Sequence, residues 1–232
     1  DDLRQIKTEE ELTYLARAEE IGDKAFEKLL KVVKPGMTEL EVAAELEYLM
    51  KKEGAEDLSF NTIIASGLNS SMPHAIPGYK KLEVGDFVTC DFGCKYKGYC
   101  SDMTRTFVLG KASDKQKEIY NVVLKAQLAG LAAVKAGVSG ASVDKVARDI
   151  ITEAGYGKNF NHRLGHFIGR DVHEYGDVSS VNDMEVEEGM IFSIEPGVYL
   201  EGDFGVRVED LVMVTQDGCQ VLNSFTKDIY II

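Results

Sequence analysis

Residues 85–93 read Gly-Asp-Phe-Val-Thr-Cys-Asp-Phe-Gly, and a related pattern returns at 189–197 as Gly-Met-Ile-Phe-Ser-Ile-Glu-Pro-Gly. An earlier stretch repeats as well, because Val-Lys-Pro-Gly-Met-Thr at 33–38 corresponds to Val-Lys-Ala-Gly-Val-Ser at 134–139. The two repeats have similar offsets, keep the same order and fall on matching kinds of element, which indicates an internal duplication. We therefore expect two related units, each made of two helices followed by a carboxylate-bearing hairpin.

Helix signals mark both units. Thr or Ser followed three residues later by Glu or Gln is a capping-box pattern, which satisfies the free amides of a first helical turn. It occurs at 8–11, 38–41 and 113–116, and apolar residues at helical spacing follow. The predicted helices cover about 8–34, 38–54, 113–137 and 142–154, and the predicted strands cover 59–65, 84–94 and 98–109. We expect a single α+β domain over residues 1–232, with pseudo-twofold symmetry and helices over one face of a curved, mainly antiparallel sheet.

Composition excludes several classes of protein. Of the 232 residues, 44% are hydrophobic and 28% charged, which is near the globular average. The 26 basic and 39 acidic residues give a net charge of −13, which disfavours nucleic acid and anionic membranes as partners. No apolar run reaches the roughly 20 residues that span a bilayer. Four cysteines are too few for a disulfide scaffold, so we expect a soluble, cytoplasmic protein, with a thiol metal site between Cys94 and Cys100 as a weaker alternative to core packing.

Acidic side chains recur at matching places in the two predicted hairpins. A four-residue loop over 95–98 would set Asp91 directly opposite Asp102, and the second hairpin repeats the arrangement with Glu195 and Glu209. Opposed residues have Cβ atoms about 4.5–5.5 Å apart, so paired carboxylates repel each other unless a cation lies between them. Any one of these acids could be an ordinary surface carboxylate, but four in repeated positions favour a metal site.

The four histidines adjoin this acidic group. His162, His166 and His173 precede the second hairpin, and His74 precedes the first. Four carboxylates with one or two imidazoles suit divalent manganese, cobalt, iron or zinc, and four acids exceed the needs of one ion. Two such ions can activate water for hydrolysis. By contrast, the sequence lacks a serine-nucleophile elbow, a P-loop and a dinucleotide-binding glycine motif.

Six short motifs, in this order along the chain, carry a family resemblance. They are Asp91-Phe-Gly93, Ser101-Asp102-x-Thr104-Arg105-Thr106, Leu164-Gly-His166, Val172-His173-Glu174, Ile194-Glu195-Pro-Gly197 and Val206-Arg207-Val-Glu209-Asp210. With these motifs the chain resembles the pita-bread metallopeptidases, the group that holds methionine aminopeptidase, Xaa-Pro aminopeptidase and Xaa-Pro dipeptidase. The resemblance extends from about Leu3 to the C-terminus and implies the pita-bread fold.

The resemblance also implies a role for each site residue. Two divalent metal ions, with manganese as the first expectation, would be held by Asp91, Asp102, His166, Glu195 and Glu209. His74, His162 and His173 would contact the substrate or move protons, and Arg207 would order the residues around the metals and help to bind the substrate. In a hydrolytic mechanism we expect Glu195 to carry a proton to the leaving nitrogen, His173 to stabilise the oxyanion and His74 to help position the substrate.

Finer features are similar to the proline-specific branch of this family. His162 lies four residues before His166, the sequence Val-Arg-Val-Glu-Asp stands at 206–210, and the hairpin between Glu195 and Glu209 is short. We therefore expect hydrolysis of the bond before proline in a small peptide, by a catalytic domain whose full-length form adds an N-terminal domain and forms a homodimer. The alternatives are a methionine aminopeptidase-like enzyme, a metal-free creatinase-like hydrolase and a non-catalytic binding module.

Two positions depart from the family pattern. Phe167 replaces the glycine that usually follows the metal-binding histidine, and Tyr175-Gly176-Asp177 stands where a proline is common. We expect the ring of Phe167 to narrow the cleft or shift the backbone. Both departures bear on substrate preference.

Overall fold

The computed structural model describes residues 2–232 and groups the predicted helices into two packed pairs, α2 with α3 and α4 with α5. The helices are α1 (Asp2–Gln5), α2 (Glu9–Leu29), α3 (Glu39–Glu53), α4 (Asp114–Ala133) and α5 (Gly140–Glu153), with the short 3-10 helices η1 (Gly67–Ser71) and η2 (Gly157–Asn159). The first long helix ends at Leu29, earlier than predicted, and the turn bonds Lys31 N–H to Lys28 O and Val32 N–H to Leu29 O follow it. Within residues 2–232, no helix combines the length and the apolar character needed to cross a membrane.

Side-chain caps start the first three long helices at the predicted residues, and α5 starts two residues earlier than predicted. In α2 the Thr8 hydroxyl accepts a hydrogen bond from the Glu11 amide, and the Glu11 carboxylate accepts one from the Thr8 amide at 2.8 Å. The same reciprocal bonds start α3 at Thr38 and α4 at Ser113, whereas α5 begins with the hydroxyl cap of Ser139 alone. Each cap satisfies backbone amides that would otherwise lack partners, which stabilises a helix by about 1 kcal/mol.

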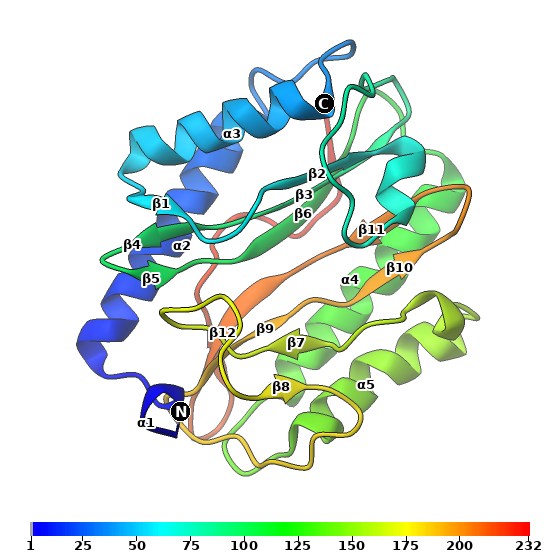
Figure 1. Ribbon diagram of the computed structural model, residues 1–232. Coiled ribbons are helices and arrows are strands. Elements are labelled where there is room, and N and C mark those ends of the chain that lie inside the picture. The colour runs from blue at the N-terminus through cyan, green and yellow to red at the C-terminus, as the bar shows by residue number, and fades with distance from the viewer. Residues whose placement is uncertain (1) are drawn as a thin grey trace.

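The strands run between the two helix pairs (Figure 1). The first half contributes β1 (Asp57–Leu58), β2 (Ile63–Ser66), β3 (Phe87–Phe92), β4 (Cys94–Tyr96), β5 (Tyr99–Cys100) and β6 (Met103–Val108). The second half contributes β7 (Gly165–His166), β8 (Asp177–Val178), β9 (Ile191–Ile194), β10 (Gly197–Tyr199), β11 (Gly205–Arg207), β12 (Asp210–Val214), β13 (Cys219–Val221) and β14 (Tyr230–Ile231). The main sheets have the orders β14-β6-β3-β2 and β13-β12-β9, and pairing is antiparallel except between β14 and β6, which confirms the mainly antiparallel arrangement.

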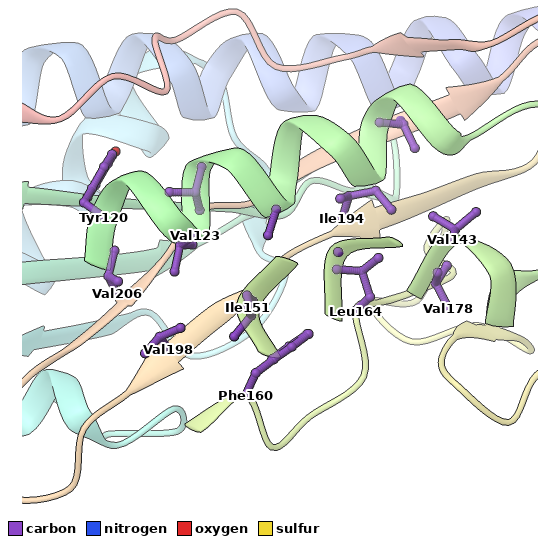
Figure 2. Close-up of a cluster of buried hydrophobic side chains, with 14 of the residues drawn as sticks. Tyr120, Val123, Val143, Ile151, Phe160, Leu164, Val178, Ile194, Val198 and Val206 are labelled. Carbon is purple, nitrogen blue, oxygen red and sulfur yellow. The ribbon is translucent and has the colours of Figure 1, made fainter. Parts of the chain in front are cut away.

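Each helix pair buries its apolar face on the strands of its own half. Phe26 of α2 stacks on Phe92 of β3 with ring centroids 5.5 Å apart, inside the core of the first half. The core of the second half lies between α4, α5 and the strands β9 to β12, and Figure 2 shows Val123 of α4 and Ile151 of α5 within it. Burial of this apolar surface holds the helices against the sheet, and the polar ends of the strands are left to form the site.

The duplication predicted from the sequence is visible in the strand pairing. In the first half, Ile63 of β2 lies opposite Asp91 of β3. In the second half, the amide of Glu195 donates a hydrogen bond of 2.8 Å to the carbonyl oxygen of Leu164. The two pairs occupy equivalent places in the repeats, so each half presents one acid from the same kind of strand.

The register of the first hairpin differs from the prediction. Asp91 lies opposite Thr104, so it is not directly opposite Asp102. The connection is a two-residue turn at 97–98, with both residues at positive φ (51° and 77°), rather than a loop of four residues. Positive φ at both central residues defines a type I′ turn, which matches the twist of a hairpin. In this register Asp102 falls opposite Gly93, and the two aspartates remain diagonal neighbours on one face of the sheet.

The thiols belong to the core. Cys90, Cys94 and Cys100 are buried and free. Cys100 lies opposite Lys95 in the β4–β5 ladder, so it does not face Cys94. Core packing therefore explains these residues better than a thiol metal site.

Candidate metal centre

A cavity of about 560 Å³ is lined by both halves of the molecule, and its wall contains every site residue predicted from the sequence. These residues are Asp91, Asp102, His166, Glu195, Glu209, His74, His162, His173 and Arg207. The first half supplies two of the acids and His74, and the second half supplies the rest. The structure therefore brings together residues that are more than a hundred positions apart in the sequence.

Strand ends place the five predicted metal ligands. Asp91 lies within β3 and Asp102 directly precedes β6, while His166 ends β7. Glu195 directly follows β9 and Glu209 directly precedes β12. The ladders on either side of these two glutamates share one register, which sets Glu195 opposite Glu209. Both hairpins thus direct acids to one point between the sheets.

Three of these side chains form a compact group that could hold a metal ion. One ligand atom each from Asp102, His166 and Glu209 lies within 4.8 Å of the others. The Nε2 atom of His166 is 3.3 Å from Oδ2 of Asp102 and 3.6 Å from Oε1 of Glu195. The other ring nitrogen of His166 is 3.2 Å from the carbonyl oxygen of Phe167. A proton on that nitrogen would leave Nε2 free to bind a metal.

The electrostatics of the acids favour a bound cation. Burial, together with repulsion from neighbouring carboxylates, raises the pKa of Asp102 and of Glu209 well above the usual range. Burial also raises the pKa of Asp91, against the opposing effect of Arg207. Within residues 2–232, Oδ1 of Asp91 and Oδ1 of Asp102 are buried without a hydrogen-bond partner. Unpaired buried acceptors are costly, and four carboxylates with one imidazole are a donor set that suits divalent cations.

A buried chain of hydrogen bonds runs from Asp91 to His162 through Arg207. The Arg207 guanidinium pairs with Oδ2 of Asp91 at 2.6 Å and donates to the Thr104 hydroxyl at 3.1 Å. It also donates to the Tyr199 hydroxyl at 2.7 Å, and that hydroxyl is 3.0 Å from Nε2 of His162. This chain fixes the orientation of one predicted metal ligand and one predicted substrate-contacting residue together.

Glu209 is held from its backbone and from its side chain. The Thr104 hydroxyl donates to Oε2 of Glu209 at 2.6 Å, and the Glu209 amide donates to the Thr104 carbonyl at 3.1 Å. Arg105 donates to the Glu209 carbonyl oxygen and forms a buried ion pair of 2.6 Å with Asp210. Gln127 of α4 donates to the other oxygen of Asp210 at 2.8 Å. These bonds join the two halves directly behind the predicted metal ligands.

The remaining histidines line the cavity wall. The ring of His173 packs edge-on against His166 with centroids 4.3 Å apart. Desolvation, together with positive charge from His166 and Arg163, lowers the pKa of His173 to about 4, so its imidazole is neutral at pH 7. Burial is also the main cause that lowers the pKa of His162. His74 lies in the loop after η1 and is exposed toward solvent.

Several cavity residues were not predicted from the sequence. In the wall, Phe60, Ile63 and Val172 are apolar, and Arg163 adds a positive charge. Tyr199, outside the lining residues, links Arg207 to His162. Apolar and aromatic residues that line a cavity look like core residues in a sequence, so no pattern selected Phe60, Ile63 or Val172. Tyr199 differs from these residues, because a tyrosine hydroxyl that is buried needs a hydrogen-bond partner and therefore points to a polar site.

The expectation that Phe167 narrows the cleft is wrong. Its side chain is fully buried and packs on Phe192 in the core, with centroids 5.3 Å apart. Gly176 lies directly over this ring, and a Cβ atom at Gly176 would be 3.0 Å from it. Gly176 also has a φ of 110°, which favours glycine. The two departures from the family pattern are therefore one packing arrangement, in which glycine at 176 makes room for the ring at 167.

Comparison with known proteins identifies relatives over nearly the whole chain. The profile of metallopeptidase family M24 matches residues 13–216. A peptidase of Bacillus subtilis, described as uncharacterized, is 44% identical over 232 residues, which is 100% of this chain and 66% of the relative. The Xaa-Pro dipeptidase of Pyrococcus horikoshii is 44% identical over 228 residues, 98% of this chain and 65% of the relative. The chain thus spans slightly less than two thirds of the length of these relatives.

Solved structures with the same fold carry related names. The X-Pro aminopeptidase of Thermotoga maritima superposes with a TM-score of 0.98 at 44% identity, covering 100% of this chain and 66% of that one. The Xaa-Pro dipeptidase of Bacillus anthracis gives a TM-score of 0.98 at 48% identity, covering 100% and 65%. The likeness of these structures confirms the predicted fold class.

Proposed function

The chain belongs to metallopeptidase family M24, and from this membership we propose that it hydrolyses the peptide bond preceding proline, as an Xaa-Pro dipeptidase or Xaa-Pro aminopeptidase. The observation that carries the proposal is the convergence of the five predicted ligands, Asp91, Asp102, His166, Glu195 and Glu209, on one cavity. Relatives named Xaa-Pro dipeptidase at 44% identity support the proline specificity.

We assign these five residues as the ligands of two divalent metal ions. When bound, the two ions would lower the pKa of water and polarise the scissile carbonyl group. The unpaired buried oxygens of Asp91 and Asp102 support this assignment, because a cation would supply the partner that each one lacks. Manganese is the first ion to test, with cobalt, zinc and iron as the alternatives.

Glu195 is our candidate for the residue that carries a proton during hydrolysis. It is only half-buried at the cavity wall, and its Oε1 accepts a hydrogen bond of 3.1 Å from the Ser193 hydroxyl. A carboxylate held in this way can accept a proton from the attacking water and pass it to the leaving nitrogen. His173, which is neutral at pH 7, can donate an N–H group to the oxyanion without first losing a proton.

The substrate would lie along the histidines of the cavity wall. Arg207 and Tyr199 orient His162 from behind, so its imidazole can contact the proline side of the peptide. His74 approaches from the other half of the molecule and helps to position the peptide. Phe60 and Ile63 offer apolar surface that suits a pyrrolidine ring.

The proposal is tested by metal analysis and by a choice of substrates. We expect close to two equivalents of divalent metal by elemental analysis after loading with manganese, and hydrolysis of Ala-Pro in preference to Met-Ala-Ser. Cleavage of the methionine peptide alone would move the specificity to a methionine aminopeptidase-like activity. Absence of bound metal after loading would contradict the metal-dependent mechanism and favour a creatinase-like hydrolase or a binding module.

Properties of the full-length protein form part of the same proposal. Because the chain spans slightly less than two thirds of its relatives, the remaining third is available to set substrate length and assembly. We propose a homodimer for the full-length protein and a cytoplasmic location. Size-exclusion chromatography with light scattering tests the first, and fractionation of cells tests the second.

A further inference from the structure

A buried carboxylate outside the metal centre holds one complete loop of the cavity wall. Glu39, the first residue of α3, is fully buried, with 0% of its surface exposed. Its Oε1 accepts hydrogen bonds from the Ser66 amide at 2.7 Å and the Ser66 hydroxyl at 2.8 Å. The Asn69 side chain donates to both oxygens at 3.1 Å, and the Gly78 amide donates to Oε2 at 3.1 Å. Ser66 and Gly78 are the two ends of residues 66–78, and Asn69 lies near the first of them.

Within residues 2–232, no basic side chain forms an ion pair with Glu39. Lys80 pairs instead with Asp86 at 2.8 Å, and it meets the bonds around Glu39 through the Ser66 hydroxyl, at 3.1 Å. A buried carboxylate is costly unless hydrogen bonds replace its water. Here the loop itself supplies those bonds, so the stability of the carboxylate and the conformation of the loop depend on each other.

The segment that Glu39 holds reaches into the candidate active site. Pro73 and His74 line the cavity, and the Pro73 carbonyl oxygen accepts a hydrogen bond of 3.4 Å from Arg207. The Ser70 hydroxyl accepts a bond of 2.9 Å from the Gly205 amide of β11, next to which η1 lies in Figure 1. Residues 66–78 therefore connect α3 to the cavity wall, with Glu39 at the far end of the connection.

The duplicated half of the molecule shows that the scaffold does not need this carboxylate. The residue equivalent to Glu39, offset by 101, is Gly140 at the start of α5. Its amide donates to the Met184 carbonyl oxygen at 3.1 Å, and a Cβ atom there would lie 2.9 Å from the Asp177 carbonyl oxygen. At this position the second half thus packs its loop by backbone contact, whereas the half that carries His74 has a buried carboxylate.

We propose that Glu39 is a positioning residue that fixes His74 at the cavity wall by binding both ends of residues 66–78. The inference rests on the proposed function, because it takes His74 as a residue that meets the substrate. Glu39 touches none of the predicted metal ligands, so its effect on catalysis passes through the loop and not through the metals.

The test compares Glu39→Gln with a matched control in the same helical turn. The glutamine keeps the shape of the side chain but turns an amino group toward donors, which removes acceptor bonds. Glu41→Gln removes the same charge from the first turn of α3, and glutamine still serves in its capping box with Thr38. Hydrogen exchange of residues 67–78 should become faster in Glu39→Gln and stay unchanged in Glu41→Gln, while both variants keep the metal content of the parent protein.

Kinetics on Ala-Pro separate positioning from general structure. We expect Glu39→Gln to lower kcat/KM roughly 10- to 100-fold, as small misplacements of substrate-positioning groups do. In the His74→Ala background the same substitution should cost almost nothing, because the two residues act as one unit. An equal loss in both backgrounds, or unchanged exchange in the loop, overturns the proposal.

A second variant covers the case in which Glu39→Gln does not fold, and hydrogen exchange covers the case in which the parent protein is inactive on Ala-Pro. If Glu39→Gln does not fold, Asn69→Ala takes its place, because it removes the side chain that bonds both carboxylate oxygens. This variant should change hydrogen exchange in the loop and kcat/KM in the same direction as Glu39→Gln, but by less. No change in either quantity overturns the proposal. If the parent protein fails to cleave Ala-Pro, the proposed function fails, whereas the hydrogen-exchange comparison still decides whether Glu39 holds the loop.

Discussion

Removal of divalent metal should destabilise the protein, and the cavity acids give the reason. Asp102 and Glu209 are buried, with 4% and 1% of their surface exposed, and one oxygen of Asp102 is without a partner within residues 2–232. Without metal, the folded state must confine these carboxylates together or protonate them, while the unfolded chain leaves them in water. A metal ion that binds only the folded state removes the repulsion between these carboxylates, and its binding free energy adds to the stability of the folded state.

The expected size of the effect follows from mass action. Free metal at a hundred times the dissociation constant stabilises a protein by about 2.7 kcal/mol for each site, or about 5 kcal/mol for two. In a chain of 150–250 residues, each kcal/mol shifts Tm by roughly 2–4 °C. Loading the stripped protein with manganese should therefore raise Tm by about 10–20 °C. The sequence has no tryptophan, so the transition is best followed by far-ultraviolet circular dichroism.

An Asp102→Asn variant provides the control that refutes or supports this reasoning. It removes one buried negative charge at almost constant volume, so the stripped variant should be at least as stable as the stripped parent. The rise in Tm on adding manganese should become much smaller. If manganese leaves the Tm of the parent unchanged, or if the stripped variant is clearly less stable than the stripped parent, the acids are not held together for a cation.

The sign of the pH dependence is also fixed. The folded-state pKa values of Asp102 and Glu209 are raised, so the stripped folded state binds more protons than the unfolded chain and loses stability as pH rises through them. Metal must displace those protons to bind. The difference in Tm between loaded and stripped protein should therefore grow as pH rises above the usual carboxyl range, and a difference that shrinks with rising pH would contradict the assignment.

Three further predictions concern single side chains. Glu195→Gln should fold and lower kcat on Ala-Pro by about 10²–10⁴-fold, the usual contribution of a general acid–base group; full activity at full metal content would remove its proposed role. Tyr199→Phe breaks the link between Arg207 and His162. It should lower kcat/KM by an amount equivalent to about 1–3 kcal/mol of transition-state stabilisation, with unchanged metal content. An unaffected kcat/KM would show that the link is dispensable. Gly165→Ala should prevent folding, since its Cβ would lie 1.8 Å from the Ser193 carbonyl oxygen, and a folded variant with native circular dichroism would mean that these strands can separate.

Local chemistry explains what the sequence could predict. Helix starts depend on residues three positions apart, so the capping boxes at Thr8 and Thr38 were readable without any tertiary information. The repeat then assigned equivalent elements to both halves and located the acids. All nine predicted site residues line the cavity because the duplication and the family motifs constrain them together.

The errors and omissions have equally physical causes. The first hairpin was misregistered because Lys97 adopts a positive φ, which a non-glycine residue does not announce in a sequence. The contacts of Glu39 with residues 66–78, and of Arg105 with Asp210, join segments that no spacing rule relates. The ring of Phe167 was expected to narrow the cleft or shift the backbone because a sequence shows which side chain is large, but not that it packs in the core.

The unequal contributions of the two halves have a consequence for cooperativity. The first half contributes Asp91 and Asp102, the second contributes His166, Glu195 and Glu209, and neither set alone has enough donors for two ions. Bound ions would cross-link the two halves, and even the shortest loop closed in this way, from Asp102 to His166, is long. Such a link restricts the unfolded chain. The loaded protein should therefore melt as one unit, whereas the stripped protein has less to prevent its halves from coming apart separately. On heating the loaded protein, metal release should then coincide with the loss of helix in both halves.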